Sequence, residues 1–261
     1  MPSPDALPYD EIHMHIADDP AITAPALLAR YDAMLNPEEA ARRDRFHFAQ
    51  HRHQFLVARA LVRSTLSLYR PDIKPAEWQF AANAYGRPRI VGDGAGALDF
   101  NLSHTDGRIV LAVCRAPSPG VDIERLDRLE TVTDIAARFF AERETRALFA
   151  LPPLMQRRRF FDLWTLKEAY IKARGMGLSI PLTDFSIHFP AEGGPAIHFA
   201  DGVDDEASRW QLWSFDAGED YALSLAISGA VPLRPRQFQS IPLMDIKEID
   251  CRILAPAKLV L

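Results

Sequence analysis

The sequence has few cysteines and no long apolar run. Only two cysteines, Cys114 and Cys251, occur in 261 residues, and their spacing fits neither a disulfide scaffold nor a zinc site. The first thirty residues contain several acidic residues and no long apolar core, so they do not resemble a signal peptide, and no later stretch reaches membrane-spanning length. We therefore expect a cytoplasmic protein with no membrane partner.

An excess of basic charge is also missing. The chain has 30 Lys and Arg against 35 Asp and Glu, a formal net charge of -5, which argues against sequence-independent binding to nucleic acid. With 48% hydrophobic and 25% charged residues, the composition is that of an ordinary globular protein. The length suits two packed halves, each able to bury a core.

Local patterns in the first half predict helices followed by antiparallel strands. Asn36 can cap a helix that begins at Pro37, with Glu39 completing a capping box. Apolar residues recur with a helical period over 55–68. A strand is expected around 78–81, and a hairpin over 98–114 that turns at Asp106-Gly107.

The second half repeats this order of elements. It predicts a helix over 157–174, strands over 185–189 and 196–199, and a hairpin over 210–227. Turn glycines recur at a spacing of roughly 110 residues, a common domain size. The pattern predicts an α+β fold that duplicates a helix plus antiparallel-sheet unit, although chance similarity of two α+β segments is the alternative. The expected parts are 1–116, 117–230 and a C-terminal extension, 231–261, whose role the sequence does not indicate.

Two carboxylates alternate with aliphatic residues just after the joint between the halves. In Gly120-Val-Asp-Ile-Glu124, a strand would place Asp122 and Glu124 on one face and the aliphatic residues on the core. Paired carboxylates suit Mg²⁺, which completes its shell with water and substrate phosphates. The alternative is a solvated strand face, which shows the same alternation.

A second polar pair lies on the helix of the second half. Glu168 and Lys172 are spaced i, i+4 and therefore share one helix face. Such a pair is usually a weak surface salt bridge. Bulky neighbours such as Trp164 and Tyr170 make a position in a cleft the competing interpretation.

The third group is Ser103-His104 on the predicted hairpin, preceded by Arg87. A lone histidine on a strand is often structural, and the pair lacks the G-x-S-x-G elbow of serine hydrolases. Arg87, His104 and Lys172 are instead the donors that a polyanion such as a phosphate would require.

Other polar groups offer weaker signals. The histidine pairs His13 with His15 and His47 with His51 lack further ligands at metal-site spacing. The run 157–159 consists of three arginines, which indicates a solvated helix start or a contact with an acidic partner.

Taken in order, these motifs resemble the 4'-phosphopantetheinyl transferases of the monomeric, surfactin-synthetase-activating type. The matching segments run from about 36 to 227: Gly86-Arg87-Pro88, Phe100-Asn-Leu-Ser-His104, Gly120-Val-Asp-Ile-Glu124, Trp164-Thr-Leu-Lys-Glu-Ala-Tyr-Ile-Lys172 and Gly175-Met-Gly-Leu178. The Asp-x-Glu at 122–124 and the Trp-x-x-Lys-Glu-x-x-x-Lys at 164–172 are together highly specific, because this pair at this separation is hard to obtain by chance. The family usually has a basic residue where this chain has Gln54, so a coenzyme contact there could be missing or supplied by His53 or Arg59.

The resemblance implies a pseudo-twofold fold that binds coenzyme A between its halves. It implies that Asp122, Glu124 and Glu168 hold Mg²⁺ against the pyrophosphate, and that Lys172 assists the leaving group. The other coenzyme contacts that it implies are Arg87, Ser103 and His104, with Arg59 as the substitute noted above.

The implied reaction transfers phosphopantetheine from coenzyme A to a serine of an apo acyl- or peptidyl-carrier protein and releases 3',5'-ADP. We assign catalysis to Glu168 as general base, with Lys172 and His104 stabilising the developing charge. The nucleophile belongs to the substrate. The alternatives are a Mg²⁺-dependent phosphohydrolase and a non-catalytic module that binds coenzyme A or a carrier protein.

Overall fold

The computed structural model describes residues 7–115, 118–127, 129, 131–229 and 231–254. The chain divides into two compact units. Within the described part, the N-terminal unit contains residues 7–82, 88–115 and 233–250, and the C-terminal unit contains 83–87, the stretch from 118 to 232 and 251–254. Residues 83–87 belong to the C-terminal unit and residues 233–250 to the N-terminal unit, although the chain on either side of each segment belongs to the other unit.

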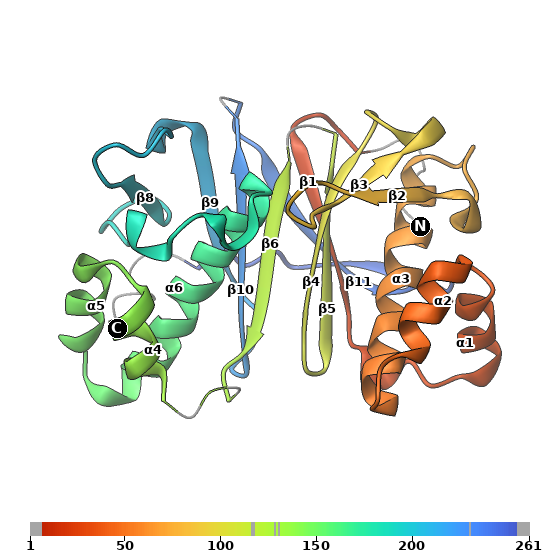
Figure 1. Cartoon of the computed structure of the whole chain (residues 1–261), viewed down its shortest axis with the longest axis horizontal. Coiled ribbons are helices and arrows are strands. Elements are labelled where there is room, and N and C mark those ends of the chain that lie inside the picture. The colour runs from red at the N-terminus through yellow and green to blue at the C-terminus, as the bar shows by residue number, and fades with distance from the viewer. Residues whose placement is uncertain (1–6, 116–117, 128, 130, 230, 255–261) are drawn as a thin grey trace. The chain divides into compact units, whose positions relative to one another are not determined.

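The N-terminal unit is built on a five-stranded sheet with the order β12-β11-β1-β5-β4. Strand β1 pairs antiparallel with β5 and parallel with β11 (Figure 1). The parallel pair joins strands more than two hundred residues apart, with Glu11 opposite Arg234. The strands are β1 (Glu11–Ala17), β4 (Asp99–Thr105), β5 (Arg108–Cys114), β11 (Arg234–Ile241) and β12 (Asp245–Ile249).

Helices pack on this sheet around one apolar core. The expected capping box is confirmed, because the Glu39 amide donates to Asn36 Oδ1 at 2.8 Å and the Asn36 amide donates to Glu39 Oε2 at 3.2 Å. The long helix buries Leu61 and Leu66 completely. The elements are α1 (Pro25–Asp32), α2 (Pro37–Asp44), α3 (Ala49–Tyr69), β2 (Gln79–Ala82) and β3 (Pro88–Val91), with 3₁₀ turns at Asp19–Ala21, Pro75–Glu77 and Gly92–Gly94.

The C-terminal unit has a three-stranded sheet with the order β6-β10-β9. Its long helix, α6, runs along β6 and β10 and ends at Gly175, whose φ of 65° closes the helix in the left-handed conformation (Figure 1). The elements are β6 (Pro119–Arg125), α4 (Val132–Phe139), α5 (Glu142–Phe149), α6 (Pro153–Arg174), β7 (Phe185–His188), β8 (Ala196–Phe199), β9 (Trp210–Asp216) and β10 (Tyr221–Ser228), with 3₁₀ turns at Gly177–Ser179, Leu182–Asp184 and Ala207–Arg209.

Each unit repeats the same plan, which confirms the α+β class and the duplicated order of elements. A first strand is followed by two short helices, a long helix and two hairpins. The first strand, β1 or β6, pairs with the final strand of the second hairpin, β5 or β10. The predicted hairpin turn at Asp106-Gly107 is present, with Gly107 at φ 83°. The long helix of the first unit, α3, begins at Ala49, six residues before the periodic stretch at 55. The sequence pattern did not predict these first turns because they face solvent and lack the apolar period.

The C-terminal extension supplies strands β11 and β12 to the sheet of the N-terminal unit. Its residues beyond 254 lie outside the described part of the chain. Among the residues that the structure describes, no helix combines the length and the hydropathy needed to span a bilayer.

Candidate active site

Strand β6 lies directly against the backbone of α6, and Gly120 makes this possible. A Cβ atom at position 120 would lie 1.9 Å from the Ala169 carbonyl oxygen and 2.4 Å from the Ala173 nitrogen. No side chain fits into that space, so glycine is required for the close approach. The strand that carries Asp122 therefore runs alongside the helix that carries Lys172.

The two predicted motifs meet at a salt bridge. Lys172 Nζ donates to Asp122 Oδ1 at 2.6 Å and to the Val121 carbonyl oxygen at 3.3 Å. The Asp122 side chain is buried, while the Lys172 side chain is 27% exposed. The contact therefore joins a buried carboxylate to a lysine whose side chain is only partly buried.

Glu124 and Glu168 lie on the same two elements as this pair. Glu124 is 6% exposed, and Val121 and Ile123 are completely buried, so both faces of β6 are covered and the strand is not solvated. Glu168 precedes Lys172 by one helical turn and is half-buried. Across the described residues, no group of three histidine, cysteine, aspartate or glutamate side chains is arranged to hold a metal ion.

Arg87 belongs to the C-terminal unit, although the strands on either side of it belong to the other unit. Its guanidinium donates to the carbonyl oxygens of Lys172 and Ala173 and, at 2.9 Å, to that of Pro119. Asn83 adds a hydrogen bond from its side-chain amide to the Gly175 carbonyl oxygen at 2.7 Å. The turn 83–87 thus donates hydrogen bonds to the last carbonyl oxygens of α6. The last turn of a helix supplies no amide donor for these oxygens, which carry partial negative charge, so a cationic side chain such as Arg87 stabilises them.

The remaining predicted residues lie in the N-terminal unit. His104 and Arg59 both line a cavity of about 350 Å³, and His104 is exposed. Ser103, the next residue on β4, is 4% exposed and does not line this cavity, because neighbouring strand residues face opposite sides. The structure therefore brings two of the predicted coenzyme-binding residues to one cavity.

Arg59 is held in place by an aromatic ring and a carboxylate. Its guanidinium carbon lies 5.6 Å from the centre of the Phe55 ring, and its Nη1 lies 3.8 Å from Glu39 Oε1. Burial lowers the pKa of the Arg59 guanidinium, and the Glu39 carboxylate opposes this shift. Its buried Nε has no hydrogen-bond partner within the described part of the chain.

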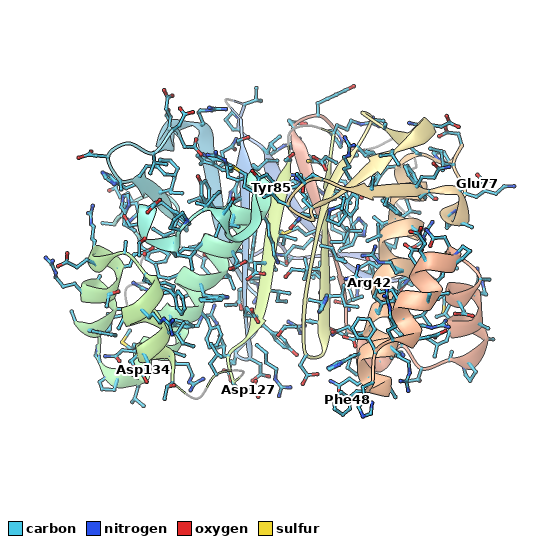
Figure 2. All side chains as sticks on the ribbon, viewed as in Figure 1. Arg42, Phe48, Glu77, Tyr85, Asp127 and Asp134 are labelled. Atoms are coloured by element: carbon cyan, nitrogen blue, oxygen red, sulfur yellow. The ribbon has the colours of Figure 1, made fainter. Side chains whose placement is uncertain are left out.

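The same cavity contains two residues that bear on the expected coenzyme contacts. Arg42, which sequence reasoning missed, extends from α2 to within 5.7 Å of the centre of the Phe55 ring (Figure 2). The sequence signal for Arg42 was its place on the helix that the capping box at Asn36 predicts. Gln54 also lines the cavity and donates to the Thr105 carbonyl oxygen at 2.8 Å, and His53 contacts the Asp19 carbonyl oxygen at 2.8 Å.

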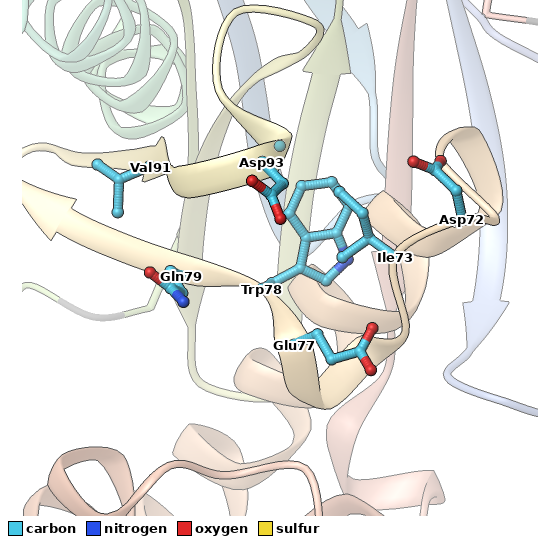
Figure 3. Close-up of a pocket in the computed structure, with 8 residues that line it drawn as sticks. Asp72, Ile73, Glu77, Trp78, Gln79, Val91 and Asp93 are labelled. Atoms are coloured by element: carbon cyan, nitrogen blue, oxygen red, sulfur yellow. The ribbon is translucent and has the colours of Figure 1, made fainter.

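Another cavity in the N-terminal unit is lined by acidic rather than basic side chains. It measures about 300 Å³, and the carboxylates of Asp72, Glu77 and Asp93 surround Trp78 (Figure 3). Three acidic side chains disfavour a polyanion such as a nucleotide diphosphate.

Two of the three weaker sequence signals prove to be structural contacts, whereas His47 and His51 are exposed. His13 Nδ1 and His15 Nε2 both contact the hydroxyl group of buried Tyr69, at 2.7 and 2.8 Å. Arg157 donates to the carbonyl oxygens of Leu126 and Leu129 at 2.7 Å each. Neither group is a simple solvated surface feature.

Comparison with known proteins identifies the family of the chain. The model of the 4'-phosphopantetheinyl transferase superfamily matches residues 118–226, and the model of the 4'-phosphopantetheinyl transferase N-terminal part matches 25–116. The chain is 34% identical to the 4'-phosphopantetheinyl transferase HetI of Nostoc sp. over 69% of this chain and 76% of HetI. It is also 34% identical to a 4'-phosphopantetheinyl transferase of Bacillus subtilis, over 75% and 83% of the two chains.

The transferase Sfp of Bacillus subtilis is 33% identical over 66% of this chain and 74% of Sfp. The chain belongs to the 4'-phosphopantetheinyl transferase superfamily and is of the Sfp type. It is therefore an enzyme that transfers a phosphopantetheine group, and the phosphohydrolase and binding-module alternatives are not favoured.

Proposed function

We propose that the Asp122–Lys172 pair marks the centre at which coenzyme A donates phosphopantetheine to a serine of an apo acyl- or peptidyl-carrier protein. The observation that carries this proposal is the 2.6 Å contact between the two motifs. The serine oxygen forms a bond to the β-phosphorus of coenzyme A, and the bond from that phosphorus to the bridging oxygen breaks. The electron pair leaves with 3',5'-ADP.

Glu168 and Lys172 would handle the proton and the departing charge. Glu168 accepts the proton of the serine hydroxyl, directly or through one water molecule. Lys172 Nζ, at the end of a partly exposed side chain, donates to the leaving phosphate as negative charge builds there. His104 adds a donor for the phosphates of the coenzyme.

The donor set suits a hard divalent cation. Asp122, Glu124 and Glu168 offer only oxygen ligands, and Asp122 Oδ1 already contacts a cationic group, Lys172. Although no three acidic or histidine side chains of the described residues are arranged around an ion, these three residues would hold Mg²⁺ once the diphosphate of coenzyme A adds its own oxygen ligands. When bound, the ion would neutralise the diphosphate and polarise the phosphorus under attack.

The cavity beside α3 is our candidate for a coenzyme A pocket. Arg59, His104 and Arg42 give it cationic or donor groups, and Phe55 gives it an aromatic wall. These groups match a nucleotide with several phosphates. We propose Arg87 as a further coenzyme contact, acting beside Lys172 through the end of α6. The Ser103 side chain is buried and faces away from this cavity, so we do not propose it as a contact there.

A mass measurement tests the reaction. The protein is mixed with coenzyme A, MgCl₂ and an apo acyl-carrier protein, and the carrier is weighed by mass spectrometry with and without EDTA. We expect the carrier to gain one phosphopantetheine group, EDTA to prevent the gain, and Asp122→Asn to reduce the rate at least ~10²-fold. An unmodified carrier together with free nucleotide released from coenzyme A would instead identify a phosphohydrolase.

We further propose that the enzyme acts in the cytoplasm as a monomer, without nucleic acid or membrane as partner. The paucity of cysteine and the net charge of -5 support this assignment. Size-exclusion chromatography with light scattering tests the monomer, and a mass of twice the chain would overturn it.

A further inference from the structure

Lys167, the residue directly before Glu168, is a completely buried lysine. Its Nζ donates to Glu144 Oε2 at 2.7 Å and to the Phe185 carbonyl oxygen at 2.6 Å. The same nitrogen lies 4.1 Å from the centre of the Phe185 ring and 5.6 Å from that of Phe140. Lys167 therefore takes no direct part in binding substrate, because no solvent reaches it.

Glu144, its partner on α5, is just as deeply enclosed. It is 2% exposed, and its carboxylate also accepts the amide of Ile187 at 2.7 Å and that of Ala141 at 3.0 Å. The pair thus connects α6 to the start of α5 and to strand β7. Lys167 Nζ donates to two fixed acceptors, and both oxygens of the Glu144 carboxylate accept from fixed donors, so the contact is directional.

Stability does not explain why the chain has an ion pair here. Removing both charges from water is costly, and apolar residues of similar volume are often equally stabilising or better. The cost is visible in both groups: burial lowers the pKa of the Lys167 amine to about 8 and raises the pKa of the Glu144 carboxyl. Apolar residues, however, would let the helix rotate or slide, because their contacts have no direction.

The contacts of α6 on its other side explain what a fixed rotation achieves. Thr165 Oγ1 lies 2.8 Å from Ser224 Oγ on β10, and the helix backbone touches β6 at Gly120. Successive helix residues are turned by about 100°, so Lys167 and the Glu168–Lys172 pair lie on different faces. Anchoring the helix face that carries Lys167 therefore fixes the direction in which Glu168 and Lys172 point.

We propose that Lys167, through its ion pair with Glu144, is a positioning residue that sets the rotation and axial position of α6, and so holds Glu168 and Lys172 opposite Asp122. This inference rests on the proposed roles of Glu168 and Lys172. It differs from them because Lys167 acts only through the helix and touches no reacting atom.

The double variant Lys167→Met with Glu144→Gln tests the proposal. It removes both charges and keeps similar volumes, and the one side-chain oxygen that remains at position 144 can still accept from one of the two backbone amides, those of Ala141 and Ile187. We expect kcat for transfer to an apo acyl-carrier protein to fall about 10²-fold, the loss typical of a misplacement of ~1 Å. The KM for coenzyme A should stay within about twofold, and the fall in kcat should persist at temperatures well below the thermal midpoint of the variant.

Glu144→Gln alone is the second variant, because it keeps Lys167 charged with two oxygen acceptors and leaves the fold least disturbed. We expect a smaller fall in kcat, again at constant KM. Asp162→Asn is the matched control: Asp162 is also buried on α6, but it pairs with Arg158 of the same helix at 3.0 Å. It should retain the wild-type kcat.

The possible results distinguish the positioning role of Lys167 from the proposed function of the enzyme. Wild-type kcat in both Glu144 variants, with active wild-type protein and Asp162→Asn, would overturn the positioning role and leave the proposed chemistry intact. An equal loss of kcat in Asp162→Asn would also overturn it, since any buried charge on α6 would then have the same effect. An inactive wild-type protein would instead refute the proposed function.

Discussion

A buried histidine in the N-terminal unit should make the folded state sensitive to acid. His15 is completely buried, and its ring stacks on Phe238 at 5.1 Å between centroids. The Glu11 carboxylate requires the proton of His13 on Nε2, so the Tyr69 hydroxyl donates to His13 Nδ1 and accepts from His15 Nε2. The Ser240 hydroxyl then donates to His15 Nδ1 at 3.0 Å. This arrangement requires neutral His15.

The magnitude follows from the pKa difference between the folded and unfolded states. Burial, reinforced by His13, lowers the pKa of His15 from 6.5 to about 3. The stabilisation is complete above the unfolded pKa and is lost as pH falls towards the folded pKa, because only the unfolded chain binds the proton between these values. The loss is about 1.4 kcal/mol per pH unit below 6.5, or about 2 kcal/mol between pH 7 and pH 5.

Urea unfolding at pH 7 and pH 5 measures this difference. His15→Gln, which keeps hydrogen-bonding groups at the site, should lose about 2 kcal/mol less than the wild type between the two pH values. The charged groups near this series of hydrogen-bonded side chains, Arg236 and Glu248, are present in both proteins, so their contributions cancel in the comparison. His198→Gln, at an exposed strand position, controls for loss of a histidine as such. Equal losses in wild type and His15→Gln would refute the reasoning.

Three further changes test the site. Glu168→Gln should lower kcat at least ~10²-fold with little change in the KM for coenzyme A, and a full rate in steady-state assays would exclude the general-base role. His104→Ala should raise that KM about tenfold, measured by coenzyme titration, because a donor to phosphate is lost; an unchanged KM would remove it from the proposed pocket. Gly120→Ala should lower the free energy of unfolding by about 3 kcal/mol or more, measured by urea unfolding, because its Cβ would lie 1.9 Å from the Ala169 oxygen. A wild-type value would contradict the close packing of β6 on α6.

Local sequence patterns determined much of the architecture. The capping box at Asn36, the turn at Gly107 and the end of α6 at Gly175 depend on contacts within a few residues, so the sequence alone predicts them. The i, i+4 spacing of Glu168 and Lys172 likewise fixed their shared face. The repeated order of these elements was visible for the same reason.

Only the tertiary structure decided how distant segments combine. The pairing of β11 with β1 and the place of Arg87 in the C-terminal unit depend on contacts between residues far apart in the chain. Local patterns carry no information about such contacts. The charged pair Lys167 and Glu144 illustrates the limit, since charged side chains are expected at the surface. Burial of both became visible only when α5, α6 and β7 were packed together, because each charge is compensated by a group from another element.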